Sequence, residues 1–154
     1  MKQKIEKNTV QETLIIPLYS RKIAKEKFPD LIGDKISDYI IEKIDYDFSQ
    51  KEKIFNSTMG LYGALEVAQR DFDLECEIKE YLKKFPEASI VNLGCGLNDL
   101  FSRVNNGKCK GYNLDFEEVI KTREELLEKQ DNEFNIPCDL NDYSWFEKIE
   151  KDNG

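Results

Sequence analysis

The feature that most constrains the fold is a short apolar segment that leads directly into a glycine turn. Residues 89–93 read Ser-Ile-Val-Asn-Leu, and Gly94-Cys95-Gly96 follow at once. A short apolar run bounded by turn residues is typical of a buried strand. Glycine lets the chain turn sharply and lets a ligand approach the backbone closely. A Gly-x-Gly also occurs in ordinary turns, so the pair alone leaves both interpretations open.

The residues after this turn continue an alternation of strand and helix. Residues 109–114 predict a second strand that ends at Asp115, residues 116–129 a helix, and residues 134–138 a third, weaker strand; a further helix opens near Ser144. Strand, glycine turn, strand with a terminal acid, helix and strand form the first half of a doubly wound α/β sheet. Ligands of such sheets bind beyond the carboxyl ends of the strands.

The residues before Phe85 have helical rather than alternating patterns. We expect a helix from Val10 to Lys27, with Thr9 and Glu12 as a capping box and with a kink or break at Pro17. A second helix is expected over residues 34–44, followed by a loop over residues 45–49.

A third and longer helix is expected from Ser57 or Thr58 through Tyr81, and residues 71–73 are the place where it could break. Its apolar stripe is predicted from the helical spacing of the following residues: Leu61, Leu65, Ala68, Phe72 and residues 74–76. The chain thus divides, on this prediction, into a helical part at residues 1–85 and a partial Rossmann-like part with three strands at residues 86–154.

Asp115 is the strongest candidate ligand contact after the glycines. It closes the second strand about 20 residues beyond the glycine turn, where an acid accepts hydrogen bonds from ribose hydroxyls. It could also cap the helix that begins near Phe116. The two roles are compatible.

Asp99 stands where the dinucleotide fingerprint has its third glycine. A carboxylate there repels phosphate, which disfavours a pyrophosphate at a helix N-terminus and weakens the hypothesis of an NAD-dependent oxidoreductase. A cofactor with adenosine but no phosphate fits better, and S-adenosylmethionine is the common one.

Two further sites each have two interpretations. Asp139 and Leu140 follow the third strand and suit an adenine, whose amine would donate to the carboxylate; Asp139 could equally cap a turn towards Asn141. Arg70 could hold a carboxylate bidentately. From the residues alone a surface ion pair is the better interpretation of this arginine.

Composition excludes several kinds of chemistry. The chain has 154 residues, no histidine and four cysteines without a CxxC pair, so we expect neither a metal site nor a histidine-dependent triad. The net charge of −8 argues against nucleic acid as a partner. No run of residues is long enough to span a membrane, and no signal peptide is evident, so a cytoplasmic protein with reduced cysteines is expected.

Stretches along almost the whole chain resemble the leucine carboxyl methyltransferase family, in particular its bacterial branch related to tetracenomycin-type polyketide O-methyltransferases. The matching stretches occur in the family's order: VQETLIIPLYSRKIAKEKFPD, IIEKIDYDFS, AQRDFD, SIVNLGCGLNDLFSRVNNGK, YNLDFEEVIKTREELL and CDLNDYSWFEKI. The resemblance implies a class I S-adenosylmethionine-dependent methyltransferase with an N-terminal helical cap, acting on a carboxylate or hydroxyl of a small molecule.

The resemblance also assigns residues to the cofactor. Arg70 matches the arginine that holds the cofactor's carboxylate, and Arg21 could match a further basic residue of the cap. Gly94 and Gly96 match the glycines beneath its amino-acid portion. Asp115 matches the ribose-binding acid. Asp139 and Leu140 match the adenine contacts. No catalytic base is assigned.

The sequence departs from the family in two ways. Family members continue Gly-x-Gly with leucine, aspartate, threonine and arginine, whereas this chain has Leu97-Asn98-Asp99-Leu100. Family members are also considerably longer, which implies that the later strands are missing. A truncated, non-catalytic binding or interaction module is therefore the alternative function. The first strand would then have an open edge, so we expect a homo-oligomer or a partner chain that covers it.

Overall fold

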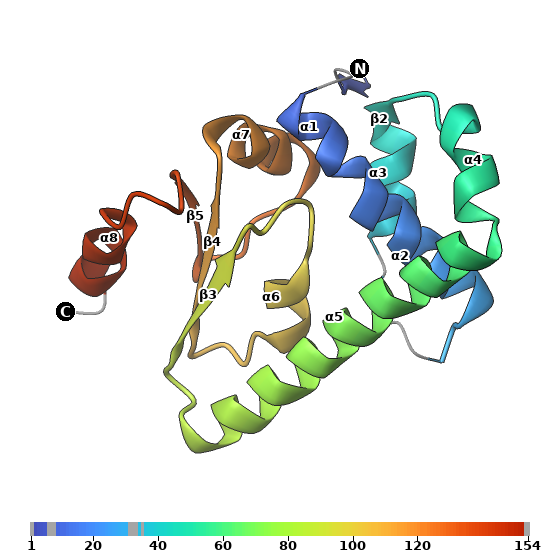
Figure 1. The fold of residues 1–154 in the computed structure, drawn as a ribbon. Helices are drawn as coiled ribbons and strands as arrows, with labels where there is room; N and C mark the ends of the chain where they lie inside the picture. Colours follow the sequence, from blue (N-terminus) through green and yellow to red (C-terminus); the bar gives the residue numbers. More distant parts are fainter. Residues whose placement is uncertain (1, 6–8, 31–33, 35, 153–154) are drawn as a thin grey trace. The chain divides into compact units, whose positions relative to one another are not determined.

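The protein is a mixed α/β chain that separates into two compact units, residues 1–76 and residues 77–154. The computed structural model describes residues 2–5, 9–30, 34 and 36–152, and Figure 1 shows the order of the helices and strands. Each unit contains its own small parallel sheet. The long helix α5 (Thr58–Lys84) contributes its first turns to one unit and its last turns to the other.

The first unit is mainly helical. Its two-stranded sheet pairs Gln3 with Ile44 and Lys4 with Asp45 in parallel. The elements that precede α5 are β1 (Gln3–Lys4), α1 (Val10–Thr13), α2 (Ile15–Lys27), α3 (Ser37–Lys43), β2 (Ile44–Asp45) and α4 (Ser49–Phe55).

Pro17 divides the first predicted helix into α1 and α2. The expected break is confirmed, but it lies at Leu14, three residues before the proline. The proline ring clashes with the carbonyl of the residue four positions earlier, which is Thr13, and the proline has no N–H to donate. Pro17 therefore sits in the first turn of α2, where neither defect interrupts the helix.

The predicted capping box at Thr9 and Glu12 is wrong. Thr9 has an extended backbone conformation at the N-cap, but its side chain makes no capping hydrogen bond. The Glu12 carboxylate instead accepts from the Tyr46 hydroxyl at 2.6 Å and from Lys51 Nζ at 3.0 Å. Partners more than thirty residues away along the chain outcompete the local backbone.

The second predicted helix is shorter than expected. The structure has α3 over Ser37–Lys43, and Ile44 begins strand β2 instead of ending a helix. Asp34 lies before the helix and accepts from the backbone N–H groups of Ile36 and Ser37, at 3.0 and 3.2 Å. Residues 31–33 and 35 lie outside the described residues. Helix α4 (Ser49–Phe55) was not predicted.

Helix α5 is continuous through residues 71–73, so the break considered there does not occur. Its small residues Ala64 and Ala68 are fully buried and let other side chains approach the helix closely. They pack in a core with Tyr19, Ile23, Ala24 and Phe55. The predicted apolar stripe of this helix is wrong towards its C-terminal end, because the side chains of Phe72 and Leu74 are 45% and 44% exposed.

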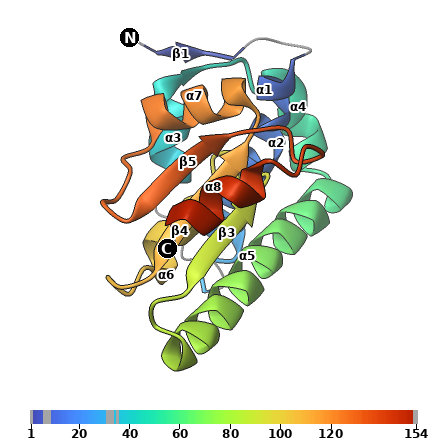
Figure 2. The same cartoon turned by 90° about the vertical axis from the view of Figure 1, so that its left-hand side faces the viewer.

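The second unit is built on a parallel sheet with strand order β3-β4-β5 (Figure 2). Ser89 pairs with Lys110 and Leu93 with Leu114; Gly111 pairs with Glu133 and Asp115 with Pro137. The strands are β3 (Ser89–Leu93), β4 (Lys110–Asp115) and β5 (Glu133–Pro137), connected through α6 (Leu100–Val104) and α7 (Glu117–Leu126), and α8 (Trp145–Asp152) follows. All three predicted strands are confirmed, whereas the short helix α6 was not predicted.

Helices cover both faces of this sheet. On one face, Trp145 and Ile149 of α8 pack against Tyr112, Leu114 and Ile136. On the other face, Leu82 of α5 packs with α6 through Leu100, Phe101 and Val104. Gly111 lies under the Phe101 ring, which leaves no room there for a side chain. The continuous burial of residues 111–114 along β4 thus matches a strand that is covered on both faces.

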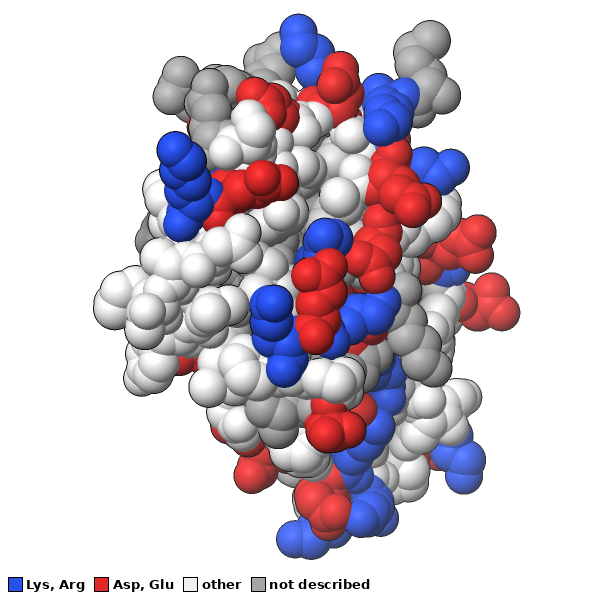
Figure 3. All heavy atoms as spheres, turned by 90° about the vertical axis from the view of Figure 1, so that its right-hand side faces the viewer, with Lys and Arg blue, Asp and Glu red and all other residues white. Residues whose placement is uncertain are grey.

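The charged side chains are interspersed. Lysine and arginine lie next to aspartate and glutamate on the face shown in Figure 3, with no extended patch of one sign. No helix among the described residues is both long enough and apolar enough to cross a bilayer.

Two glycines of α5 provide a matched test of this packing. A Cβ on Gly60 would lie within 2.6 Å of the Cα of Phe55 and closer still to the carbonyl oxygen of Ile54, whereas a Cβ on Gly63 meets nothing within 4 Å. We expect Gly60→Ala to lower the free energy of unfolding by about 1–3 kcal/mol, because backbone atoms must move. Gly63→Ala should raise it by about 0.5–1 kcal/mol, through helix propensity. Urea unfolding followed by circular dichroism measures both; equal effects of the two substitutions would contradict the packing.

Candidate functional site

The carboxyl ends of the three strands of the second unit meet at one edge of the sheet. The N–H groups of Gly94 and Cys95 donate to the carbonyl of Leu114 at 2.8 and 3.1 Å, which fixes the turn after β3 against the end of β4. The N–H of Cys138 donates to the carbonyl of Asp115 at 2.9 Å, which fixes the end of β5 against β4. The candidate residues predicted at these three strand ends are therefore brought to the same edge.

The turn after β3 requires glycine at both predicted positions. Gly94 has φ +66° and Gly96 has φ +50°, which is the left-handed region that side chains disfavour. A Cβ built on Gly94 has no atom within 4 Å, so the space beside this backbone is open. The turn therefore combines a conformation that needs glycine with an accessible backbone.

Asp115 holds this turn with its side chain. Its Oδ2 accepts from the backbone N–H of Gly96 at 2.9 Å, and its Oδ1 accepts from the N–H of Phe116 at 2.8 Å. The side chain lies just before α7, whose N-cap is Phe116. Each carboxylate oxygen can accept more than one hydrogen bond, so the two bonds to the backbone leave capacity for hydroxyl groups.

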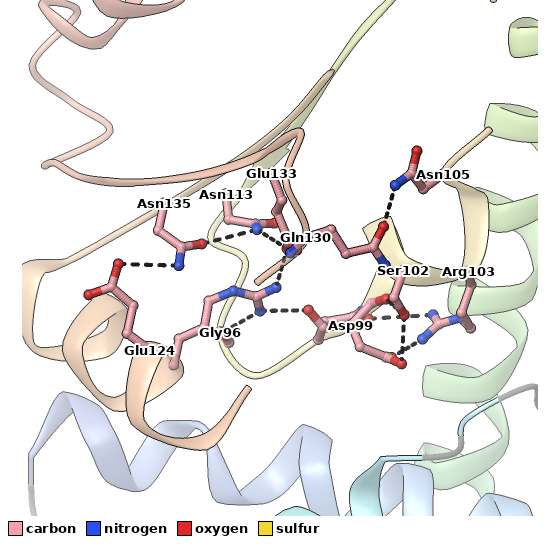
Figure 4. A network of polar contacts seen from close by, with 12 residues as sticks. Gly96, Asp99, Ser102, Arg103, Asn105, Asn113, Glu124, Gln130, Glu133 and Asn135 are labelled. Carbon is pink, nitrogen blue, oxygen red and sulfur yellow. Dashed lines mark hydrogen bonds and ion pairs between the residues drawn. The ribbon is translucent and has the colours of Figure 1, made fainter. Parts of the chain in front are cut away.

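Two buried residues that were not singled out in the sequence analysis also hold this turn: Arg123 contacts it directly, and Glu133 binds Arg123. Arg123 of α7 donates from Nη1 to the carbonyls of Gly96 and Asn98, at 3.1 and 2.6 Å. Its Nη2 donates to Glu133 Oε1 at 3.0 Å. Figure 4 shows Glu133, Gly96 and Asn113 within one network of polar contacts.

A signal for Arg123 was present in the sequence. Within residues 116–129, Val119, Ile120, Leu126 and Leu127 are apolar residues at the spacing of one helix face, and Arg123 lies on that same face. A charged residue on an inward face is expected to have a buried partner. No comparable local signal identified Glu133, because Arg123 and Asn113, the partners of its Oε1, come from other elements.

Asp99 is the residue at the position of the missing third glycine. It is 9% exposed and forms an ion pair with Arg103 of α6. Its backbone and side chain also accept from the Ser102 hydroxyl, at 2.7 and 3.2 Å. The Asp99 carboxylate is therefore neutralised by an arginine of the short helix that follows it.

Asp139 and Leu140 lie just after β5. Asp139 Oδ1 accepts from the backbone N–H and from the side-chain amide of Asn141, both at 2.9 Å. The turn-capping interpretation of Asp139 is thus observed. Leu140 is half-buried and packs against the cluster on the α8 face of the sheet.

The two candidate arginines belong to the first unit. Arg70 lies on α5 and is exposed, whereas Arg21 lies on α2 and is 3% exposed. Both positions fall within residues 1–76, whereas the glycine turn belongs to the second unit. Their roles towards a cofactor stay predictions.

Comparison with known proteins identifies a relative and a family for this chain. A relative from Streptomyces glaucescens, the tetracenomycin polyketide synthesis O-methyltransferase TcmP, is 25% identical over 150 residues, which cover 97% of this chain and 53% of the relative. The chain therefore spans about half the length of that protein. The sequence model of leucine carboxyl methyltransferases matches residues 22–153, which include the glycine turn, Asp115 and Arg123. This chain belongs to the leucine carboxyl methyltransferase family.

Proposed function

We propose that the edge formed by Gly94, Gly96 and Asp115 binds S-adenosylmethionine, as the first half of a class I, Rossmann-like methyltransferase domain. The observation that carries this proposal is the hydrogen bond from the Gly96 N–H to Asp115 Oδ2, at 2.9 Å. It places a glycine turn and an acid side by side at the carboxyl ends of adjacent parallel strands. Strand order β3-β4-β5, with β3 outermost, agrees with the first half of a doubly wound sheet.

The chemistry of these groups suits an adenosyl ligand. A carboxylate accepts hydrogen bonds from the two ribose hydroxyls. The open space beside Gly94 admits the amino-acid portion close to the backbone. The ion pair with Arg103 neutralises the Asp99 carboxylate, so the expected repulsion of pyrophosphate is weakened. The argument against NAD that remains is the absence of the third glycine, which lets helix and strand pack closely in dinucleotide sites.

The remaining contacts of the proposed site rest on the family resemblance. Asp139 and Leu140 would meet the adenine, Arg70 would hold the carboxylate of the cofactor, and Arg21 would assist from α2. Asp139 would accept from the adenine amine in addition to Asn141, since each oxygen has two lone pairs.

The proposed reaction is methyl transfer to a carboxylate or hydroxyl oxygen of a small molecule. S-adenosylmethionine supplies a methyl group on a positively charged sulfur, and the acceptor oxygen takes that methyl while the C–S electron pair stays on the sulfur. A carboxylate acceptor needs no base, whereas a phenol must lose a proton. The part played by this chain is to bind and orient the cofactor. The alternative is a binding module that does not transfer the methyl group.

Cys95, between the two glycines, is unsuited to act as a nucleophile in this site. Burial raises the pKa of its thiol to about 12. The nearby Arg123 charge lowers that pKa, but by less than burial raises it. Because only the thiolate is nucleophilic, Cys95 stays inert near neutral pH. All four cysteines are free, which suits the cytoplasmic location that we propose.

The outer edge of β3 leads to a proposal about assembly. Among the described residues no strand pairs with that edge, and Leu93 at its end is 52% exposed. An exposed edge with apolar side chains favours pairing with another strand. We propose that a second copy of this chain covers it, because two identical edges can pair about a two-fold axis.

Asp115→Asn tests the ligand site with little change of shape. An amide has one accepting oxygen, so its NH₂ group would face the N–H of either Gly96 or Phe116, and neither of these two donors would have an acceptor. We expect the Kd for S-adenosylhomocysteine to rise about tenfold to a hundredfold, the usual effect of losing a charged hydrogen-bond acceptor. Titration calorimetry measures it. Asp131→Asn, an exposed residue with the same change in charge, is the control. Tighter binding of NAD than of S-adenosylhomocysteine by the parent protein would overturn the proposal.

Tritiated-methyl transfer into small-molecule acceptors then separates an enzyme from a binding module. Label in a small molecule, lost in Asp115→Asn, is the result expected of a methyltransferase. Binding without transfer supports the alternative.

Alkylation tests the environment of Cys95. With its pKa at about 12, roughly one thiol in 10⁴ is ionised at pH 8. Iodoacetamide should therefore modify the exposed Cys76 well before Cys95, and mass spectrometry of peptides distinguishes the two. In urea, both cysteines should react at similar rates. Rapid modification of Cys95 in the folded protein would contradict its burial.

Sedimentation tests the proposed self-association. The sedimentation coefficient of the parent protein should increase with concentration, and Leu93→Lys should suppress this increase by placing a charge on the edge. Ile54→Lys, at an apolar side chain that is 66% exposed on α4, should leave it unchanged. A parent protein that stays monomeric at high concentration would rule the proposal out.

A further inference from the structure

Arg123 is a buried cation that the proposed ligand contacts do not use. It lies in α7, and its side chain is 4% exposed; the side chain of its partner Glu133 is 6% exposed. A charge in such surroundings is tolerated only when it is paired and hydrogen-bonded. Arg123 meets this requirement, because its guanidinium is paired with Glu133 and hydrogen-bonded to backbone carbonyls.

The guanidinium joins three elements. Nη1 donates to the carbonyls of Gly96 and Asn98, and Nη2 donates to Glu133 at the start of β5. Arginine suits this arrangement because its rigid planar fork offers several donors in fixed directions. A lysine would present one nitrogen on a flexible stem.

Both peptide groups beside the Gly96 Cα are therefore held from different sides. Asp115 Oδ2 accepts from the N–H of the peptide group before it, and Arg123 Nη1 donates to the carbonyl of the peptide group after it. Because peptide groups are planar, fixing these two groups fixes the backbone angles of Gly96. The left-handed conformation of this glycine, with φ +50°, thus depends on one anion and one cation.

Glu133 is satisfied within the same network. Its Oε1 accepts from Asn113 Nδ2 at 2.6 Å as well as from Arg123, and its Oε2 accepts from the N–H of Gln130 at 3.1 Å. A buried ion pair contributes little net stability compared with apolar side chains of the same size. Its directional contacts with the glycine turn are therefore its distinctive contribution.

We infer that Arg123 is a positioning residue for the ligand site: anchored by Glu133, it holds the turn at Gly96 to Asn98 in the binding conformation before any ligand arrives. This inference rests on the proposed function, because it assigns the turn to a bound adenosyl ligand. Arg123 itself does not touch the ligand in this scheme. It acts through the backbone carbonyls, so its loss should weaken binding without removing any ligand contact.

The double variant Arg123→Met with Glu133→Gln tests the inference without leaving a charge buried alone. The side-chain amide at position 133 keeps one accepting oxygen for either Asn113 or Gln130, and its NH₂ group lies against the other donor. We therefore expect an unchanged circular dichroism spectrum and a urea midpoint below that of the parent. The Kd for S-adenosylhomocysteine, measured by calorimetry, should rise at least tenfold. Amide hydrogen exchange at residues 96–99 should accelerate at least tenfold, while exchange in β4 stays unchanged. Arg123→Lys, which keeps the charge, should give intermediate values.

The control is Lys121→Met with Glu117→Gln, which removes an ion pair from the same helix. That pair is exposed, at 67% and 70%, and lies apart from the buried network beneath the turn, so binding and exchange should match the parent. Unchanged Kd and unchanged exchange in a folded double variant would overturn the inference. If the double variant fails to fold, Arg123→Lys decides: parent-like binding and exchange overturn the inference. A parent protein that binds no S-adenosylhomocysteine contradicts the proposed function instead, and exchange at the turn still tests the role of Arg123.

Discussion

One carboxylate, Asp115, joins the ends of all three strands of the second sheet. Its side chain accepts from Gly96 in the turn after β3, and its backbone carbonyl accepts from Cys138 after β5. Asp115 itself ends β4. A glycine turn in the left-handed region has few conformational restraints of its own, so its shape must come from such partners. The opposing cation, Arg123, completes the restraint, and the candidate site exists because these two charges act on the same short stretch of backbone.

The parts of the fold that could be predicted from sequence depend on local patterns. Strands β3, β4 and β5 follow from short apolar runs between turn residues, and Gly94 and Gly96 stand where the backbone conformation disfavours side chains. Asp115 could be identified from the sequence because its position at the end of the strand that follows the glycine turn is visible within about 20 residues. The break near Pro17 was predicted for the same reason, although the ring acts on the preceding turn and so moves the break to Leu14.

The parts that could not be predicted depend on partners distant in the sequence. Glu12 does not form the expected capping box, because its carboxylate accepts hydrogen bonds from Tyr46 and Lys51. Strand β2 forms by pairing with β1, which lies about forty residues earlier in the sequence. The buried pair of Arg123 and Glu133 is recognisable only when α7 and β5 are placed together. The family match spans residues of both units, whereas the role of Arg70 towards a cofactor stays a proposal, because Arg70 belongs to the first unit and the glycine turn to the second.

The sequential order of the sheet has a consequence for biosynthesis. Every pairing in β3-β4-β5 joins residues only about twenty positions apart, as for Ser89 with Lys110 and Gly111 with Glu133. Short separations in sequence favour rapid folding, and chains fold from the N-terminus as they leave the ribosome. The glycine turn and its acid can therefore be assembled while translation is still in progress, as soon as β4 has emerged. Nascent chains long enough for Pro137 to have left the ribosomal exit tunnel should already contain the three-stranded sheet.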